Sequence, residues 1–301
     1  MLSTKNILIQ ITNSGKGKEL SREELSKLQE HLFKMYRDIE SVCARHGLNL
    51  CLAYGNVIGA MRHNGWIPWD DDLDIHMSRE DYDLFLKKYA HELPPQYKVS
   101  SYLTEGGSYA RFAKIIDTST VHVPIGGEKT EDSGVFIDIF PIDNVPTGKF
   151  RNKLCRVWSL FMMYTATSVM QVEENSREWR DLMFSSKAGK ANWRFRQAWG
   201  RVFSFASSRI WHRWIEQFAH NKKYTGMCHV MADLAVCYRQ VPADFYFPFR
   251  QIDLPHIGKV YIPNKYDEYL SVSYGDWRKI PKDADKWHHY VRELFIPDEA
   301  E

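Results

Sequence analysis

Residues 69–76 read Trp69-Asp70-Asp71-Asp72-Leu73-Asp74-Ile75-His76, an acidic run that leads into an apolar strand. Alternation along a strand points Asp72 and Asp74 to the same face. Carboxylates packed together repel one another and are costly to bury unless a cation neutralises them. Asp70 and Asp71 precede the strand, so one is expected to orient the site and the other to lie in solvent. Because oxygen ligands suit hard cations, the run predicts Mg²⁺ or Mn²⁺ held by Asp72 and Asp74.

A further acidic residue lies in the apolar run Val135-Phe136-Ile137-Asp138-Ile139-Phe140-Pro141. A lone carboxylate between large apolar side chains needs a partner, because burying an unpaired charge is costly. If this strand lies beside the one that carries Asp72 and Asp74, Asp138 supplies a third metal ligand or accepts the proton of an attacking hydroxyl. The alternative is a structural carboxylate that binds an arginine or a backbone amide, and the sequence leaves both open.

The segment before the acidic run is predicted to fold as helix, strand, glycine turn and short helix. Ser21 and Glu24 have the spacing of a capping box, apolar residues recur at three- and four-residue steps, and Gly47 ends the helix. The apolar run 48–54 predicts a strand, and the small residues 55–60 predict a turn followed by helix. Strand, glycine turn and helix start are the ingredients of a phosphate site.

Phosphoryl transfer needs metal carboxylates, a backbone cradle and cations that offset the charge of the phosphates. Gly55 and Asn56 would let backbone amides approach a phosphate, and Arg62 follows them with a guanidinium suited to phosphate oxygens. Arg111 and Lys114 precede Asp138 and are further candidates. The alternative for a cation is a surface charge or a salt bridge, which is favoured for Arg111 and left open for Lys114.

The rest of the pattern predicts a mixed core with a helical appendage. A helix begins at Ser78, which has capping-box spacing to Asp81. Extended runs follow at residues 97–103 and 109–116, which a turn at Gly106-Gly107 joins, and at residues 135–140, a run that is expected to end at Pro141. Residues 1–145 are therefore predicted as an α/β (α+β mixed) core with a small, largely antiparallel or mixed sheet. Residues 146–240 read as a helical segment rich in tryptophan and arginine, and residues 241–301 as a segment that packs back on the core.

Charge is segregated along the chain. The formal net charge is +2, but residues 146–225 hold 15 lysines and arginines against 5 aspartates and glutamates. Such a segment could meet an anionic substrate or membrane headgroups, although a solvated helical face is the commoner meaning of a basic run. The uncharged stretch 157–170 is too short to span a bilayer, so a buried helix is expected there and any membrane contact would be peripheral.

Several functional classes are disfavoured by what the sequence lacks. It has no P-loop or Rossmann glycine pattern, its histidines match no zinc or Ser-His-Asp spacing, and no nucleic-acid-binding motif is evident. Five cysteines lie far apart without a Cys-x-x-Cys pair, which favours a reducing compartment. The N-terminus lacks the length and flanks of a secretory signal, so a cytoplasmic protein is expected.

The region around the acidic run closely resembles the core motif of the LicD family, bacterial phosphocholine transferases related to fukutin. The matching run is Tyr54-Gly55-Asn56-Val57-Ile58-Gly59-Ala60-Met61-Arg62-His63-Asn64-Gly65-Trp66-Ile67-Pro68-Trp69-Asp70-Asp71-Asp72-Leu73-Asp74-Ile75. It is reinforced by Arg79-Glu80-Asp81-Tyr82, by Phe136-Ile137-Asp138-Ile139-Phe140-Pro141-Ile142-Asp143, and by Tyr274-Gly275-Asp276-Trp277. The resemblance covers both ends of the chain and is weak only across about 146–240.

The resemblance implies a nucleotidyltransferase-like core in which Asp72, Asp74 and Asp138 form the metal triad. It also implies a CDP-alcohol donor, such as CDP-choline, whose distal phosphate and alcohol pass to a hydroxyl of a cell-surface glycan or a lipid-linked glycan precursor, releasing CMP. Lipopolysaccharide or teichoic acid biosynthesis at the inner membrane face would be the setting. The alcohol could be choline, ethanolamine, ribitol or glycerol. Asn56 departs from the Ser, Gly or Thr that usually follows the glycine in this fold.

If the donor carries a quaternary ammonium, aromatic ring faces are expected to hold it. Candidates are Trp66, Trp69, Tyr274 and Trp277, which lie in or near the matched motifs, and their alternative is core packing. The full set of expected substrate-binding residues is Gly55, Asn56, Arg62, Trp69, Asp70 and Lys114.

Two other functions stay open. A nucleotide-sugar glycosyltransferase shares the D-x-D metal motif, which Asp70-x-Asp72 and Asp72-x-Asp74 both satisfy, and it would release a nucleoside diphosphate. A non-catalytic scaffold could keep the fold to bind a nucleotide or a glycan, although acidic residues at every expected place argue against it.

Overall fold

The fold is built around a seven-stranded mixed sheet. The computed structural model describes residues 19–101, 103–104, 112–125, 127, 129–220, 223–230, 240–282 and 291–298. The strands run in the order β1-β2-β6-β4-β3, and β7 and β8 extend the far end of β6. Their bounds are β1 Leu50–Leu52, β2 Asp74–Ser78, β3 Tyr97–Ser100, β4 Ala113–Asp117, β6 Val135–Asn144, β7 Met227–His229 and β8 Val241–Pro242. The predicted mixed α/β core is confirmed.

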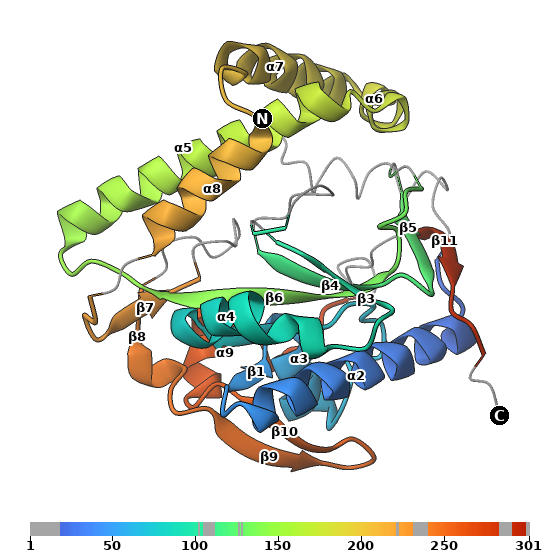
Figure 1. Cartoon of the computed structure of the whole chain (residues 1–301), viewed down its shortest axis with the longest axis vertical. Coiled ribbons are helices and arrows are strands. Elements are labelled where there is room, and N and C mark those ends of the chain that lie inside the picture. The colour runs from blue at the N-terminus through green and yellow to red at the C-terminus, as the bar shows by residue number, and fades with distance from the viewer. Residues whose placement is uncertain are drawn as a thin grey trace.

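The central strand β6 joins the two acidic segments of the sequence. It pairs in parallel with β2 and antiparallel with β4, while β1 pairs antiparallel with β2. Apolar side chains of these strands, such as Ile75, Ile137 and Ile139, are fully buried. Two helices, α2 (Arg22–Arg45) and α4 (Arg79–Leu84), pack against β6 on the side opposite the appendage (Figure 1). Both acidic strands are therefore fixed in the middle of the core.

The two predicted helix starts are confirmed. The Ser21 hydroxyl accepts from the Glu24 amide and the Glu24 carboxylate accepts from the Ser21 amide, which is a complete capping box on α2. The Ser78 hydroxyl accepts from the Asp81 amide at 3.0 Å and caps α4. The helix continues from α4 through the π-helical turn η2 (Phe85–Tyr89) and the 3₁₀ turn η3 (Ala90–Glu92).

Two expected element boundaries are wrong. The strand predicted to end at Pro141 continues as β6 to Asn144, and Pro141 lies opposite Met77 of β2. Pairing between β4 and β6 stops at Ile139, so the missing N–H of Pro141 removes no bond to β4. The predicted turn at Gly55 is instead the first turn of the helix α3 (Tyr54–Ile58), which passes into the π-helical turn η1 (Gly59–His63). The predicted turn at Gly106 and Gly107 lies outside the described residues.

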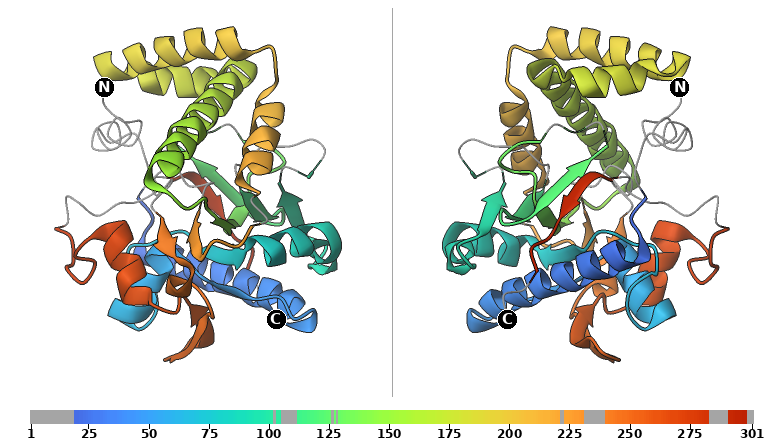
Figure 2. Two further views of the ribbon diagram at one scale, coloured as in Figure 1. Left: turned by 90° about the vertical axis from the view of Figure 1, so that its left-hand side faces the viewer. Right: turned by 90° about the vertical axis from the view of Figure 1, so that its right-hand side faces the viewer.

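Residues 146–240 begin as a layer of four helices, α5 (Lys149–Glu174), α6 (Arg177–Phe184), α7 (Lys187–Phe203) and α8 (Ser208–Ala219). They stand above the sheet and have their own apolar core, which α5 shares with α8 (Figures 1 and 2). The helices end at Ala219, and β7 already belongs to the core sheet. The stretch 157–170 is helical as expected, but only its second part is buried, since Val157 and Trp158 are exposed.

The last part of the chain packs on the core. It contributes the hairpin of β9 (Arg250–Leu254) and β10 (Gly258–Ile262), the 3₁₀ turn η4 (Ala243–Phe245) and the helix α9 (Tyr266–Tyr274). Tyr269 and Leu270 of α9 are buried in the main core. A separate two-stranded antiparallel sheet is formed by β5 (Val121–Pro124) and β11 (Val291–Phe295). Among the helices that the structure describes, none is long and apolar enough to cross a bilayer.

Candidate active site

The parallel pairing of β2 and β6 brings the two acidic segments together. Asp74 and Asp138 are direct partners in its register, and the Asp138 amide donates to the Leu73 carbonyl at 3.3 Å just before β2 begins. The strand neighbourhood on which a third carboxylate depended is therefore confirmed. Neither the sequence spacing nor composition required it, because 64 positions separate the two residues and only the sheet topology joins them.

Asp74 lies at the centre of a cluster of negative charge. Burial raises its pKa well above the ordinary value, and the nearby carboxylates of Asp72, Asp138 and Asp70 raise it further, in that order. Lys114 opposes this shift. A cation placed among these oxygens would reverse the shift, because it favours the ionised carboxylate.

Lys114 stands opposite Asp138 on the antiparallel neighbour β4. Its ammonium lies 2.6 Å from an Asp138 carboxylate oxygen and 3.6 Å from the centre of the Phe136 ring. Of the two interpretations that the sequence left open for Lys114, the structure contains the salt bridge. A contact with substrate phosphate stays a prediction for Lys114. Arg111, the other cation considered on this strand run, lies outside the described residues.

The carboxylates fit a hard divalent cation by their chemistry. Asp72, Asp74 and Asp138 supply oxygen ligands only, which Mg²⁺ and Mn²⁺ prefer, and they carry an excess of negative charge at one point. Among the described residues, no three His, Cys, Asp or Glu side chains are arranged to hold a metal ion, so these carboxylates are not positioned as a ligand set. Asp138 is turned toward Lys114, so the metal triad remains a prediction.

Asn56 supports the acidic segment through its side chain. Its amide nitrogen donates to the Asp72 carbonyl at 3.0 Å, and its amide oxygen accepts from the Asp74 backbone N–H at 2.7 Å. The Asn56 backbone N–H donates to the Ala53 carbonyl. These bonds hold Asp72 and Asp74 in a fixed backbone geometry, which is a different role from the phosphate cradle expected of Asn56. Its contact with a phosphate remains untested.

Gly55 allows Asp70 to approach the helix α3. A Cβ atom on Gly55 would lie 3.0 Å from an Asp70 carboxylate oxygen, so a side chain at this position would push Asp70 away. The Gln29 amide of α2 donates to the Asp70 carbonyl at 2.8 Å and thereby holds the loop in place. Asp70 also acts on Asp74 through its charge.

Arg62 binds the C-terminal part of the chain. Its guanidinium donates to the carbonyls of Trp277 at 2.6 Å and Lys279 at 3.2 Å, and its Nε donates to His63. The expected contact between Arg62 and a phosphate therefore stays a prediction. What the structure contains is a link between η1 and the residues after α9.

The aromatic candidates for a choline site are divided by burial. Trp277 is buried and its indole N–H donates to Asp267 at 2.8 Å, so Trp277 is a core residue. Trp66 and Trp69 are half-buried against the main core, and Tyr274 is exposed. Trp69 lies edge-on to His63 with 5.9 Å between ring centres. Trp66, Trp69 and Tyr274 remain candidates.

A buried network that the sequence did not predict links β2 to α9. The His76 ring contacts the Phe140 carbonyl through Nδ1 at 3.4 Å and the Tyr269 hydroxyl through Nε2 at 3.1 Å. The Tyr269 oxygen also accepts from the Tyr54 backbone N–H at 3.0 Å. Burial lowers the pKa of His76 to about 3, so the ring is neutral, and a proton on Nδ1 lets Tyr269 donate to Nε2. This network fixes the middle of β2, two residues after Asp74.

A second unpredicted cluster surrounds Arg79 at the start of α4. Arg79 donates to both carboxylate oxygens of Asp143, at 2.6 and 3.0 Å, and to Glu216 of α8 at 2.6 Å. The sequence contained one signal for it, because Arg79 and Asp143 lie in two of the motifs that resemble the LicD family. Glu216 carried no signal, since it lies in the segment where that resemblance is weak.

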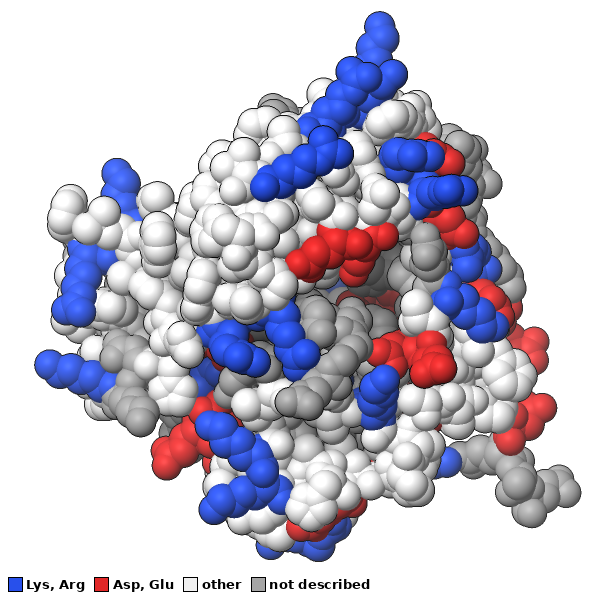
Figure 3. Space-filling model, turned by 45° about the horizontal axis from the view of Figure 1, so that its top comes forward, with Lys and Arg blue, Asp and Glu red and all other residues white. Residues whose placement is uncertain are grey.

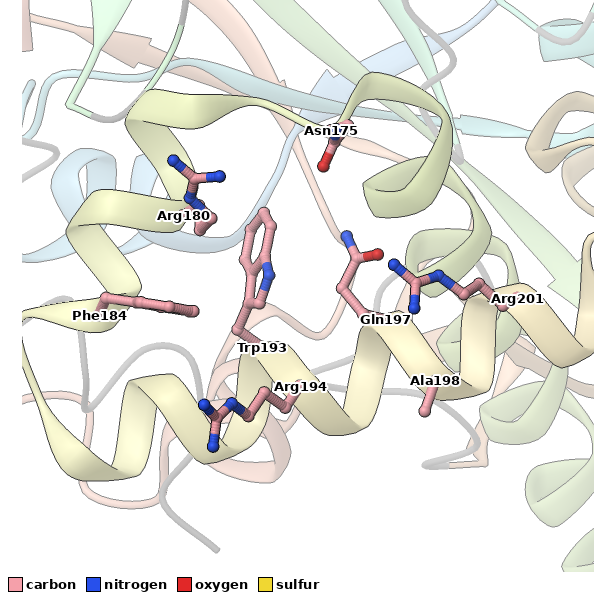
Figure 4. A pocket seen from close by; sticks show the side chains of 8 residues that line it. All are labelled: Asn175, Arg180, Phe184, Trp193, Arg194, Gln197, Ala198 and Arg201. Carbon is pink, nitrogen blue, oxygen red and sulfur yellow. The ribbon is translucent and has the colours of Figure 1, made fainter.

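The helical appendage contains a hollow of about 310 Å³ that is separate from the carboxylates. It lies between α6 and α7, where Trp193 and Gln197 of α7 point toward the α6 side (Figure 4). Three arginines line it, namely Arg180, Arg194 and Arg201. None of the residues predicted for catalysis lines this hollow, so the candidate active site is the carboxylate cluster of the sheet.

The fold thus gathers carboxylates from two parallel strands of a mixed sheet and places Lys114 opposite Asp138. Comparison with known families identifies the kind of domain that contains them. Residues 47–170 match the family model described as LicD/FKTN/FKRP, nucleotidyltransferase domain. The match begins at the end of α2, includes every predicted metal ligand, and ends within α5. Residues 47–170 therefore form a LicD-family domain.

The chain is also similar to individual proteins of Haemophilus and Rickettsia. The chain is 26% identical over 266 residues to the lipopolysaccharide cholinephosphotransferase LicD of Haemophilus influenzae, which covers 85% of this chain and 92% of that protein. An uncharacterised protein of Rickettsia prowazekii is 26% identical over 115 residues, 38% of this chain and 40% of that protein. One from Rickettsia typhi is 32% identical over 71 residues, 24% of this chain and 21% of that protein. The first alignment extends well beyond the nucleotidyltransferase domain.

Proposed function

We propose that this chain transfers a phosphoalcohol, with phosphocholine as the first choice, from a CDP-linked donor to a hydroxyl of a cell-surface glycan or its precursor. The observation that carries the proposal is the register pair Asp74 and Asp138, with Asp72 and Lys114 beside it. Similarity to the cholinephosphotransferase of Haemophilus influenzae over 85% of the chain supports the choice of alcohol. We expect the reaction in the cytoplasm, at the inner membrane face.

Asp72 and Asp74, together with Asp138, would hold Mg²⁺ or Mn²⁺. The bound cation supplies Lewis-acid stabilisation of the charge that develops on the phosphate oxygens. Asn56 keeps the backbone of Asp72 and Asp74 fixed, so their side chains need little reorganisation. The carboxylate of Asp70 adds negative charge near Asp74 and thereby strengthens the preference of the site for a cation.

Asp138 is our choice for the general base. It accepts the proton of the acceptor hydroxyl while the hydroxyl oxygen forms a bond to the distal phosphorus of the donor. The bond between that phosphorus and the bridging oxygen breaks, and CMP leaves with the bonding electrons. Lys114 holds Asp138 in position through its 2.6 Å contact, and Asp138 returns the proton to solvent after product release.

The experiment is a donor panel. Purified protein is incubated with CDP-choline, CDP-ethanolamine, CDP-glycerol, CDP-ribitol or a nucleotide sugar, with Mg²⁺ or with EDTA, and products are followed by phosphorus NMR. We expect CMP from CDP-choline only when the metal is present. Release of a nucleoside diphosphate from a nucleotide sugar would instead identify a glycosyltransferase. Donor binding that is independent of metal, with no product from any donor, would identify a scaffold.

A further inference from the structure

The first half of α5 exposes a stripe of large apolar side chains. Phe150, Leu154, Val157 and Trp158 recur at the spacing of one helical face, and all four are exposed, Phe150 to 77%. Later in the same helix, residues such as Met162 and Met163 are buried. The stripe therefore extends past the part of α5 that α7 and α8 cover.

The exposed side chains of α7, α8 and their connection continue this surface. Val202 and Phe205 are 70% and 72% exposed, and Phe195 and Trp214 are exposed as well. Ring contacts connect these side chains to α5 through the apolar core of the appendage. Trp158 stacks on Phe161 at 5.2 Å, Phe161 meets Phe203 at 5.5 Å, and Phe203 meets Phe205 at 6.1 Å. Trp214 joins through Trp211, which lies 6.3 Å from Phe161.

Basic side chains lie between and around these apolar ones. The sequence has no Asp or Glu from 149 to 172 or from 182 to 215, whereas Arg151, Lys153 and Arg156 interrupt the stripe of α5. These three, with Arg201 and Arg213, are exposed and form no ion pair within the described part of the chain. Figure 3 shows a broad uncharged area over the appendage, with lysine and arginine side chains around it and acidic side chains at one edge.

The arginine-lined hollow lies at the edge of the same surface. On α7, Arg194 directly precedes Phe195 and Arg201 directly precedes Val202, so the lining of the hollow and the exposed apolar residues alternate along one helix. Guanidinium groups bind phosphate oxygens well. A surface of this composition fits apolar acyl chains and anionic phosphates presented together.

We propose that the outer surface of α5, α7 and α8 docks on an anionic lipid bilayer, with its apolar residues at the acyl boundary and its arginines and lysines among the headgroup phosphates. Contiguous exposed apolar side chains of this kind mark an interaction site. The lack of Asp and Glu at residues 149–172 and 182–215 favours a negatively charged surface over a second copy of the chain, which would bring like charges together. The inference does not depend on the proposed chemistry.

Docking of this surface would set the distance between the bilayer and the carboxylates. The strand β6, which carries Asp138, is followed by α5 after only residues 145–148. Arg79 also ties α8 to β6 through Glu216 and Asp143. A lipid-linked acceptor in the bilayer would therefore lie at a fixed distance from the carboxylates of the sheet.

Vesicle flotation of the full chain tests the inference. Purified protein is mixed with vesicles of phosphatidylcholine alone or with about one-third phosphatidylglycerol, at low and high salt. We expect binding to the anionic vesicles that weakens with salt. The variant Leu154→Ser/Trp158→Ser and the variant Arg151→Gln/Lys153→Gln/Arg156→Gln should each weaken binding at least about tenfold.

Matched controls lie on other faces. Tyr261→Ser replaces an exposed aromatic residue of β10, and Lys88→Gln/Lys259→Gln removes two exposed lysines of the core. Both controls should bind vesicles as the unchanged protein does, and circular dichroism should show that all variants fold. Equal binding by all variants would overturn the inference. So would a dimer in sedimentation analysis that Leu154→Ser/Trp158→Ser dissociates while vesicles are never bound. CMP release from CDP-choline is measured separately and tests only the proposed function.

Discussion

Arg79 of α4 and Glu216 of α8 are joined by a hydrogen-bonded ion pair of 2.6 Å, and Arg79 binds Asp143 of β6 at the same time. All three side chains are buried. The pair thus connects the helical appendage to the sheet that carries the carboxylates. Breaking one partner of such a pair leaves uncompensated buried charge, which costs far more than an exposed ion pair contributes.

Arg79→Met should lower the free energy of unfolding by about 3–5 kcal/mol, because Asp143 and Glu216 would lose their common cation inside the protein. Urea denaturation followed by circular dichroism measures this. The control is Arg292→Met, which breaks the exposed pair with Glu178 and should cost less than about 1 kcal/mol. Equal effects of the two changes would show that the buried cluster does not stabilise the fold.

The same cluster should make stability depend on pH. Burial raises the pKa of Glu216 to about 7, against an ordinary value of 4.5, and Arg79 only partly offsets this. A carboxyl with a raised pKa in the folded state stabilises the fold fully below pH 4.5, and that contribution is lost as the pH rises through 7. The free energy of unfolding should therefore fall across this window.

Glu216→Gln should flatten that fall, because an amide keeps an acceptor for Arg79 but does not titrate. Thermal unfolding at several pH values between 4.5 and 8 measures the slope. Glu178→Gln is the matched control, since Glu178 forms an exposed pair, and it should leave the slope unchanged. A slope that is the same in all three proteins would place the pH dependence elsewhere in the chain.

Local elements could be predicted from the sequence because their signals are local. The capping box at Ser21 and Glu24 specifies a helix start by itself, and the period of apolar residues specifies α2. The adjacency of Asp74 and Asp138 could be predicted only on a condition, namely that two predicted strands are neighbours in the sheet. Each of these strands carries a carboxylate that no local partner explains.

Other features depend on contacts between distant residues and could not be read in advance. Asn56 was expected at a phosphate, yet its side chain is used by the backbone of Asp72 and Asp74, 16 and 18 positions later. Glu216 joins Arg79 across 137 positions. The exposure of α5 is similar, since the uncharged stretch 157–170 predicts burial, whereas Val157 and Trp158 are exposed.

The close approach at Gly59 gives a packing prediction. A Cβ atom there would lie 2.5 Å from the Gly65 carbonyl oxygen and 2.9 Å from the Ile67 backbone nitrogen, which are rigid groups. Gly59→Ala should therefore lower the free energy of unfolding by about 1–3 kcal/mol. In Gly65→Ala the added atom would meet only the end of the Ile257 side chain at 3.5 Å, so stability should change little. Denaturant unfolding measures the free energy of unfolding of both variants. Equal values would show that the backbone near Gly59 can accommodate a Cβ atom.

Asn56→Ala should weaken the site without touching a carboxylate. It leaves the Asp74 N–H and the Asp72 carbonyl without their side-chain partner, which should cost about 1–3 kcal/mol of stability. If the proposed function is right, CMP release should also fall, because Asp72 and Asp74 lose their fixed backbone. Asn49→Ala changes an exposed asparagine and should alter neither quantity. Unchanged stability of Asn56→Ala would remove the supporting role assigned to Asn56.

Asp74→Asn should separate function from stability. Burial and the charges of Asp72 and Asp138 raise the pKa of Asp74, so its ionised form destabilises the metal-free fold at neutral pH. The neutral amide should raise the free energy of unfolding in EDTA by about 1 kcal/mol or more. Added Mg²⁺ should stabilise the unchanged protein and have little effect on the variant, because only the former binds it tightly. CMP release by the variant should fall at least about a hundredfold.

Asp253→Asn, on the exposed side of β9, should leave all of these measurements unchanged. A variant that is less stable in EDTA, or that keeps its Mg²⁺ response, would show that Asp74 is a structural carboxylate and not a metal ligand.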